Sequence, residues 1–304
     1  MNPALFDRSR GVADGFILIA VLWIVAALAT LASIYSIYAV NTAAASHVAD
    51  DRLQAEASIR AGVELAAFQL LASPERTRPT HGAFEARVGR TNIVVRYRSE
   101  RARIDLNGAP KELLAGLFAA VGVGASNAAD YADRIVGWRT PPDANADNAE
   151  ASNYKTAGFP YPPRQAPFND PLELSLVRGL PPEIVERILP DVTVFGGGAQ
   201  VDVVDAEPEV LAALPGMTPD ILQKVLAARA ENPADGQGLM KLLGPASGAG
   251  TVEAGKAFRA GILVDLGRGR HVAADVVFQL DDGDEEPYGV VYWRDDFDGP
   301  FQSL

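Results

Sequence analysis

The sequence predicts an α+β fold in which a long amino-terminal helix accompanies a small antiparallel sheet, and a large helical insert divides that sheet. Residues 16–40 carry no charged side chain, and a helical pattern continues beyond them. Apolar and polar residues alternate in residues 83–106 and again near the carboxy terminus, as in half-buried strands. Between these strands, residues 107–258 have the pattern of short helices punctuated by Pro and Gly.

The composition is that of a folded chain of about two domains. The 304 residues are 48% hydrophobic, which is enough to form hydrophobic cores. Cysteine is absent, so neither disulfide bonds nor a thiolate metal site can form. The formal net charge of -12 argues against a general attraction to the phosphates of nucleic acids. A nucleic-acid role would need a local basic patch.

The amino-terminal apolar segment is the strongest signal in the sequence. Residues 16–40 exceed the roughly 20 apolar residues that cross a bilayer core as a helix. A secretory signal peptide would have a shorter apolar region, followed by a cleavage site and a break in the pattern. Here the helical pattern continues until Ser73 and Pro74 end it. We expect one helix over residues 16–72 with a transmembrane part at residues 16–40.

The helical insert contains two stretches that echo each other. Asn107 precedes Pro110, and Asp205 precedes Pro208, with a leucine three residues after each proline. In both stretches an Asx side chain can cap a helix just after a short strand. The echo predicts two related helical units, residues 107–200 and residues 201–258.

The turns between these helices leave a nucleic-acid alternative open. Helix-hairpin-helix modules bind backbone phosphates through Gly-rich turns at helix N-termini, and such turns occur at residues 121–124, 179–182 and 215–219. The last turn lacks a second Gly and nearby basic residues, and Asp220 would repel a phosphate. We therefore favour a helical domain for protein contacts over a membrane-anchored DNA-binding protein of the DNA-uptake type.

The sequence contains no recognisable set of catalytic residues. The histidines His47, His81 and His271 have no nearby Ser or acid in a recognisable nucleophile motif, and each is predicted to lie on the surface. No phosphate-cradling glycine loop is present. The chain is expected not to be an enzyme, and a tethered hydrolase is the weaker alternative.

One loop has the composition of a calcium site. Oxygen-bearing side chains alternate along it, which suits the six to eight oxygen ligands of Ca²⁺. The candidate ligands are Asp143, Asn145, Asp147 and Glu150. The loop is not a complete EF-hand, because Asn148 and Tyr154 replace the Gly and Glu of that motif. Spacing alone supports a solvated acidic turn equally well. A second acidic run, residues 281–286, is interpreted as a hairpin turn.

The leader and the order of segments resemble those of type IV pilins and pseudopilins. Residues 1–15 end at Gly15, directly before the apolar run, and Gly11 is a second candidate cleavage point. Most pilins carry Glu at the fifth mature position, but here that position is Ala20, a departure that resembles the K-type minor pseudopilin of type II secretion systems. The resemblance extends over nearly the whole mature chain through the segments IDLNGAPKELLAGL, YADRIVGWR, FNDPLELSLVRGLPPEIVERI, VDVVDAEPEVLAALPGM and PYGVVYWRDD.

The resemblance implies a pilin-like helix and sheet carrying two units that are like sterile alpha motifs. It implies cleavage by prepilin peptidase between Gly15 and Phe16, and calcium bound in the helical region by the four candidate ligands. Thr140 departs from the family, which commonly has an Asp there. The implied segments are residues 1–15, leader; 16–72, long helix; 73–106, first strands; 107–200 and 201–258, helical units; and 259–304, closing strands.

The resemblance also implies a place and a role. The chain is expected to cross the inner membrane once, with its soluble part in the periplasm. Its expected partners are the I-type and J-type minor pseudopilins at the filament tip, the prepilin peptidase and the inner-membrane secretion platform. The implied role is to start pseudopilus assembly and so help export folded proteins across the outer membrane. A minor pilin of a related filament system is the nearest alternative.

Overall fold

The structure is a computed structural model that describes residues 11–142, 149–233, 235–267, 269–281, 283 and 286–296. For residues 11–16, 43–48 and 149 only the backbone is described. The chain divides into two compact units, Met1–Ala57 and Ser58–Leu304.

Helix α1 (Gly11–Leu71) accounts for the described part of the first unit and continues into the second. It contains no proline, and its many Ala and Leu residues have high helix propensity. Ser73 and Pro74 follow its end, as predicted, because a proline disfavours helical backbone at the residue before it. The helix begins at Gly11, earlier than the predicted start at residue 16, so the end of the predicted leader is also helical.

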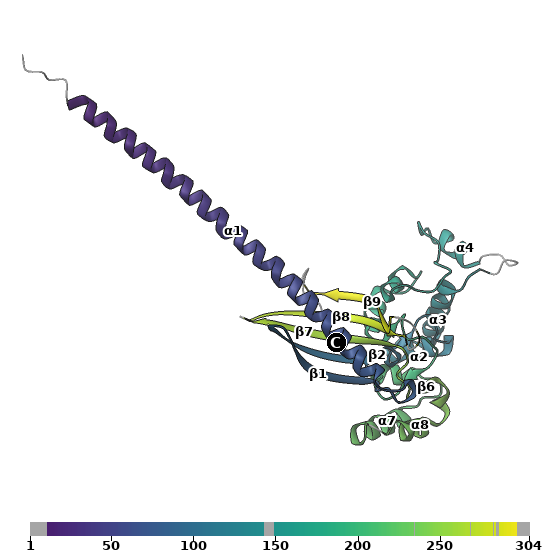
Figure 1. The fold of residues 1–304 in the computed structure, drawn as a ribbon. Helices are drawn as coiled ribbons and strands as arrows, with labels where there is room; N and C mark the ends of the chain where they lie inside the picture. The colour runs from purple at the N-terminus through teal and green to yellow at the C-terminus, as the bar shows by residue number, and fades with distance from the viewer. Residues whose placement is uncertain are drawn as a thin grey trace, which may run out of the picture. The chain divides into compact units, whose positions relative to one another are not determined.

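The second unit contains a five-stranded antiparallel sheet of order β1-β2-β7-β8-β9 (Figure 1). Side chains along β2 alternate between buried and more exposed, as the sequence pattern predicted. The sheet confirms the predicted α+β class. Its strands are β1 (His81–Val88), β2 (Thr91–Ser99), β7 (Ala257–Gly267), β8 (Arg270–Leu280) and β9 (Tyr288–Asp295).

The last turns of α1 pack on this sheet through a close approach at Gly62. A Cβ atom at Gly62 would lie 3.1 Å from Val95 Cγ2 and 3.2 Å from Ile262 Cδ1, so the missing side chain lets the helix approach the strands. A hydrogen bond of 2.8 Å joins the Ser58 and Thr91 hydroxyl oxygens at the same interface. The apolar face of this part of α1 is fully buried at Ile59, Val63, Ala66, Ala67 and Leu70.

The helical insert leaves the sheet at the end of β2 and returns at the start of β7. Ser99 and Phe258 are direct partners in the β2–β7 ladder, so both ends of the insert meet at one point of the sheet. The insert contains the α-helices α2 (Lys111–Ala120), α3 (Ala125–Arg139), α4 (Ala149–Thr156), α5 (Pro182–Ile188), α6 (Pro208–Ala212), α7 (Pro219–Glu231) and α8 (Gly236–Leu243). Its short 3₁₀ helices are η2 (Glu100–Ala102), η3 (Pro171–Leu176), η4 (Leu189–Asp191) and η5 (Gly244–Ala249), and η1 (Glu75–Thr77) precedes β1.

Two parts of the insert are each closed by a parallel pairing of two short strands. The first is closed by a parallel pairing of β3 (Ile104–Asp105) with β4 (Val192–Thr193). The second is closed in the same way by β5 (Val201–Asp202) and β6 (Gly250–Thr251). The prediction that residues 104–106 belong to the strands of the main sheet was wrong, because β3 pairs with β4 inside the insert.

An arginine clamps the start of each helical unit. Arg139, the last residue of α3, donates to the carbonyl oxygens of Leu106 and Ala109. Arg229, near the end of α7, donates to the carbonyl oxygens of Val204 and Ala206. Each guanidinium therefore satisfies carbonyl groups between a short strand and the helix that follows it.

The predicted Asx caps at the starts of α2 and α6 were wrong. The N-cap residues are Pro110 and Glu207, and neither makes a side-chain capping bond. Asn107 instead bonds both backbone groups of Phe168, at 3.0 Å and 2.7 Å. A contact between positions so far apart in the chain gives no local sequence signal.

Candidate functional site

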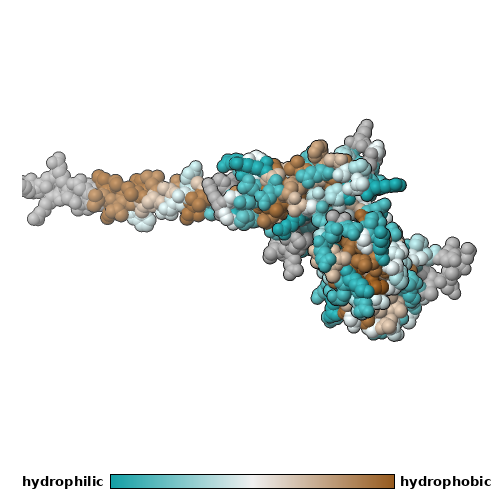
Figure 2. Space-filling model, turned by 90° about the horizontal axis from the view of Figure 1, so that it is seen from below, coloured by the Kyte–Doolittle hydropathy of each residue, from teal (hydrophilic) through white to brown (hydrophobic). Residues whose placement is uncertain are grey.

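The amino-terminal apolar segment is the first candidate site. Residues Ile17–Thr42 of α1 form a helix that is long and apolar enough to cross a membrane, and none of its most apolar window is buried within the chain. Figure 2 shows this stretch of α1 as a largely hydrophobic surface. Thr30 and Ser33 donate their hydroxyl protons to the carbonyl oxygens of Ala26 and Ala29, so these polar groups are satisfied within the helix, as a lipid environment requires.

The predicted processing site lies near the beginning of this helix. Gly15 and Phe16 both have helical backbone, and their side chains are outside the described residues. Ala20, at the fifth position after Gly15, is also in α1. Cleavage between Gly15 and Phe16 remains a prediction.

The predicted calcium loop is described only at its end. Asp143, Asn145 and Asp147 lie outside the described residues, and Glu150 is in the first turn of α4. Glu150 Oε2 accepts a hydrogen bond of 3.3 Å from Asn153 Nδ2. Glu150 Oε1 is buried and has no hydrogen-bond partner among the described residues. A buried carboxylate oxygen without a donor fits a site that is completed by a cation.

A glycine on α3 makes room for the Glu150 carboxylate. A Cβ atom at Gly137 would lie 3.2 Å from Glu150 Cδ and 3.4 Å from Glu150 Oε2. The carboxylate therefore lies against the backbone of α3, one residue before Trp138. Elsewhere in the described part of the chain, no group of three or more His, Asp or Glu side chains could hold a metal ion.

The turn between α2 and α3 lies in an acidic environment. The turn between α2 and α3 borders a cavity of about 610 Å³ that is also lined by Asp191 and Glu209. Burial, and then the charges of Glu209 and Glu207, raise the pKa of Asp191 to about 6. Arg187 lines the same cavity but donates to the carbonyl oxygen of Val121, at 2.6 Å. These charges would repel a phosphate at this turn, which argues against nucleic-acid binding there.

The histidines that the structure describes are exposed, as predicted, but each lies beside an acid. His81 Nδ1 is 2.8 Å from Asp205 Oδ1, and His271 Nδ1 is 3.7 Å from Asp265 Oδ1. Thr80 Oγ1 contacts the same Nδ1 of His81 at 3.4 Å. A hydroxyl and a carboxylate on one ring nitrogen cannot form a catalytic relay, which needs one partner on each nitrogen. The side chain of His47 is outside the described residues.

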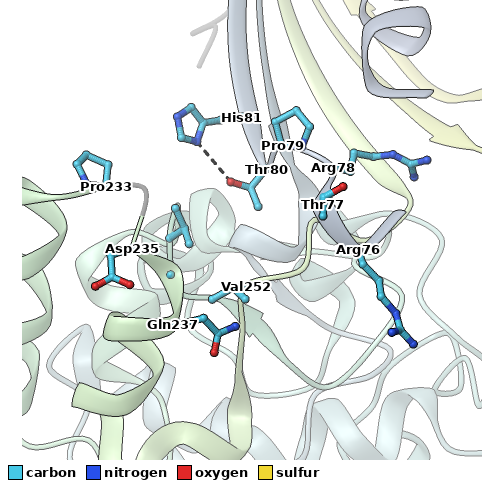
Figure 3. Close-up of a pocket in the computed structure, with 12 residues that line it drawn as sticks. Arg76, Thr77, Arg78, Pro79, Thr80, His81, Pro233, Asp235, Gln237 and Val252 are labelled. Carbon is cyan, nitrogen blue, oxygen red and sulfur yellow. Dashed lines mark hydrogen bonds between the residues drawn. The ribbon is translucent and has the colours of Figure 1, made fainter. Parts of the chain in front are cut away.

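A pocket of about 560 Å³ lies between the residues before β1 and the start of α8 (Figure 3). Two of its polar side chains are used within the protein. Asp235 accepts a hydrogen bond of 2.8 Å from Gly238 N at the beginning of α8, and His81 is paired with Asp205.

A buried ion-pair network joins the sheet to the first helical unit, and sequence reasoning missed it. Glu100 is almost fully buried, and its Oε1 accepts a hydrogen bond of 2.7 Å from Arg259 Nε. Arg259 Nη1 also donates to Asp275 Oδ2 at 2.6 Å, and Thr193 donates to Glu100 Oε2. Burial opposes ionisation of Glu100, but the guanidinium groups of Arg259 and Arg103 hold its pKa below the usual value. The partners lie far apart in the sequence, so only the fold reveals the network.

The acidic run at residues 281–286 lies in a hairpin connection, as predicted. Strands β8 and β9 pair antiparallel on either side of it, and Asp281 N donates to the Pro287 carbonyl oxygen at 2.9 Å. Asp282, Asp284 and Glu285 are outside the described residues.

Comparison with known proteins gives one family and one fold. A sequence model of the family described as "Type II secretion system (T2SS), protein K" matches residues 94–197, which include most of β2 and the first helical unit. No curated protein sequence matches the chain. The fold is similar to that of a chain in the crystal structure of the GspK-GspI-GspJ complex from the type 2 secretion system of enterotoxigenic Escherichia coli. That match has a TM-score of 0.60 and 16% identity, and it covers 82% of this chain and 98% of the other.

These findings agree with the resemblance seen in the sequence. The family is a component of a secretion machine, and the similar structure has an equivalent for almost all of its length in this chain. Residues 94–197 are thus similar to protein K of type II secretion systems, and the fold of the chain is similar to that of a chain in the GspK-GspI-GspJ complex.

Proposed function

We propose that the chain acts at the tip of the pseudopilus, where it helps start filament assembly and so supports export of folded proteins across the outer membrane. The observation that carries this proposal is the match of residues 94–197 to protein K, in a chain whose α1 also carries an uninterrupted apolar segment at Ile17–Thr42. The similar structure is a complex of GspK with GspI and GspJ, and we infer that this chain likewise binds minor pseudopilins of the I and J types.

The size of the insert supports a place at the tip. The insert occupies the chain between Ser99 and Phe258, and it emerges from one point of the sheet. A subunit stacked beside this point in a helical array would collide with so large an insert. A terminal position in the filament avoids the collision.

The apolar segment supports anchoring in the inner membrane, with the remainder of the chain in the periplasm. Small residues such as Ala26, Ala27 and Ala29 let other helices approach closely. In lipid, this close packing rather than the hydrophobic effect favours helix association. Contacts with the other pseudopilins and the secretion platform are proposed to run along this segment.

Amino-terminal processing provides the sharpest test of the assignment. We expect prepilin peptidase to cut between Gly15 and Phe16, so the mature protein begins at Phe16 only in cells that contain the peptidase. Substitution Gly15→Leu should abolish this cut, whereas the matched variant Gly11→Leu should leave it unchanged. Amino-terminal sequencing of the protein purified from membranes reads both results. A mature terminus well beyond Phe16, with the apolar helix removed, would contradict the assignment.

Calcium binding is proposed for Asp143, Asn145, Asp147 and Glu150, supported by the buried and unpartnered Oε1 of Glu150. Saturating Ca²⁺ should then raise the melting temperature of the full chain in detergent by about 5 °C at a hundredfold excess over Kd. Glu150→Gln should remove most of this shift, because it replaces a charged ligand by a neutral one. The control Glu183→Gln changes an exposed carboxylate on α5 and should keep the shift. An equal Ca²⁺ effect in both variants would exclude Glu150 as a ligand.

A further inference from the structure

A second pocket, of about 380 Å³, opens between the sheet and the first helical unit. Arginines and apolar side chains line it together, which is typical of a site that binds a charged group on an apolar stem. We call it the Arg103 pocket. Among its lining residues are Arg103, Arg259, Asp275, Leu172, Leu189 and Phe195.

One arginine of this pocket is already paired within the protein. Arg259 donates to Glu100 Oε1 at 2.7 Å and to Asp275 Oδ2 at 2.6 Å. Its guanidinium also lies over the ring of Tyr292, with 5.4 Å between Cζ and the ring centroid. This arginine stabilises the protein and has little capacity left for a ligand.

Arg103 is different, because its guanidinium is buried but makes no hydrogen bond within the described chain. Its side chain is only 10% exposed, and its single ion pair places Nη1 3.9 Å from Glu100 Oε1, which is too far for a hydrogen bond. Both oxygens of Glu100 already accept from Arg259 and Thr193. Burial lowers the pKa of Arg103, yet a guanidinium stays protonated in proteins. Its guanidinium lines the pocket, so its N–H groups are available to a ligand there.

The same pocket contains an acceptor that is also unfilled. Asp275 Oδ1 is buried and has no hydrogen-bond partner in the described residues, although Oδ2 of this carboxylate is paired with Arg259. The other carboxylate of the lining, Asp170, is occupied because its Oδ1 accepts from Leu172 N at 2.7 Å. The pocket thus presents the buried guanidinium of Arg103 and one buried acceptor, and the exposed Arg294 also belongs to its lining.

These two groups together define the chemistry of a ligand. A planar guanidinium matches a carboxylate, because two N–H groups can donate to its two oxygens. Asp275 Oδ1 requires an N–H donor, which the backbone of a peptide supplies. Leu172 lines the pocket and is 61% exposed, so apolar neighbours of an acidic residue can pack against it. We propose that the Arg103 pocket binds an acidic side chain of a partner protein.

The test uses the full chain in detergent and short peptides that are acetylated and amidated at their ends. The probe is Leu-Glu-Leu, and Leu-Gln-Leu is its neutral match, with binding measured by calorimetric titration. The glutamate peptide should bind about tenfold or more tightly, as expected for a hydrogen-bonded charge pair. Methylation of the glutamate backbone nitrogen should weaken binding if Asp275 accepts from it. Equal affinity for the two peptides, or no binding of either, would overturn the proposal.

Variants locate the effect and separate it from misfolding. Arg103→Gln should remove the preference for glutamate while the melting curve stays cooperative. Leu172→Glu adds a like charge at an exposed position that lines the pocket, and it should also weaken binding about tenfold. The matched control Leu176→Glu lies on the same 3₁₀ helix but not in the pocket lining, and it should bind normally. If 4-methylpentanoate alone binds as tightly as the peptide, the ligand is a small acid and the partner-protein assignment is wrong.

Discussion

Two buried aspartates occupy equivalent positions in the helical units, but their surroundings differ. Asp105 Oδ1 accepts from Asn107 N at 2.8 Å, and its Oδ2 accepts from Gly197 N at 2.7 Å. Asp202 Oδ1 similarly accepts from Val204 N, but its Oδ2 is buried without a hydrogen-bond partner in the described chain. Burial, and then the charge of Asp205, raise the pKa of Asp202 from 3.8 to about 7.

The pKa of Asp202 predicts how stability depends on pH. Because its pKa is higher in the folded than in the unfolded state, this group should make the free energy of unfolding fall as pH rises from about 4 to about 7. Asp202→Asn should remove that decline, so the variant should gain on the order of 2 kcal/mol relative to the parent between pH 5 and pH 8. Denaturant unfolding at both pH values measures the difference.

The equivalent substitution in the first unit is the control. Asp105→Asn turns an acceptor of the Gly197 N–H bond into a donor, so it should destabilise the protein by about 1–3 kcal/mol. A gain from Asp105→Asn, or a flat difference between Asp202→Asn and the parent across the pH range, would contradict this account.

At the residue level, the sequence predicted that the two helical units are similar, but it did not identify the side chains that hold their turns. It pointed to Asn107 and Asp205 as caps, whereas the turns are held by Asp105 and Asp202, two and three residues earlier. The partner Gly197 and the clamping Arg139 lie far along the chain from Asp105, so no local pattern could identify them.

Among the elements, the contact of α1 with the sheet depends on a glycine, Gly62, which has no side chain to keep the helix and the strands apart. The Cβ position at Gly62 is already within 3.2 Å of Ile262 Cδ1 and 3.1 Å of Val95 Cγ2. Substitution Gly62→Leu should therefore force these elements apart and lower stability by about 1–3 kcal/mol. The melting temperature of the full chain measures the effect. The control Phe68→Ala changes an exposed residue of the same helix and should have little effect.

Long elements were predictable, and short ones were not. The sequence predicted α1 and the strands of the sheet because their periodicity extends over many residues. The two-residue strand β3 has no such period, and it was assigned to the wrong sheet. Its pairing with β4 depends on the fold of the whole first unit.

For the whole molecule, the exposed apolar segment of α1 predicts firm attachment to membranes. The chain should stay in the membrane pellet after alkaline carbonate extraction. The double variant Val25→Arg and Leu28→Arg should be partly released, because each arginine near the centre of a spanning helix costs about 2.5–3.5 kcal/mol. The control Leu53→Arg changes an exposed leucine outside Ile17–Thr42 and should remain in the pellet. Equal retention of all three proteins would show that this segment is not the anchor.

The molecule-level prediction depended on the order of features more than on any one motif. The apolar helix, the split sheet and the doubled insert together predicted the family that residues 94–197 match. The buried network of Glu100, Arg259 and Asp275 was beyond sequence reasoning, because charged residues in strands normally indicate an exposed face.

Because both ends of the insert meet at Ser99 and Phe258, the insert can be added or removed without changing the rest of the sheet. A single genetic event at this junction can graft or remove the whole insert while the register between β2 and β7 is inherited unchanged. The entropic penalty for closing a longer connection grows only with the logarithm of its length, so a connection between β2 and β7 tolerates additions of very different lengths. The length and content of the insert can therefore change while the sheet keeps its strand pairing.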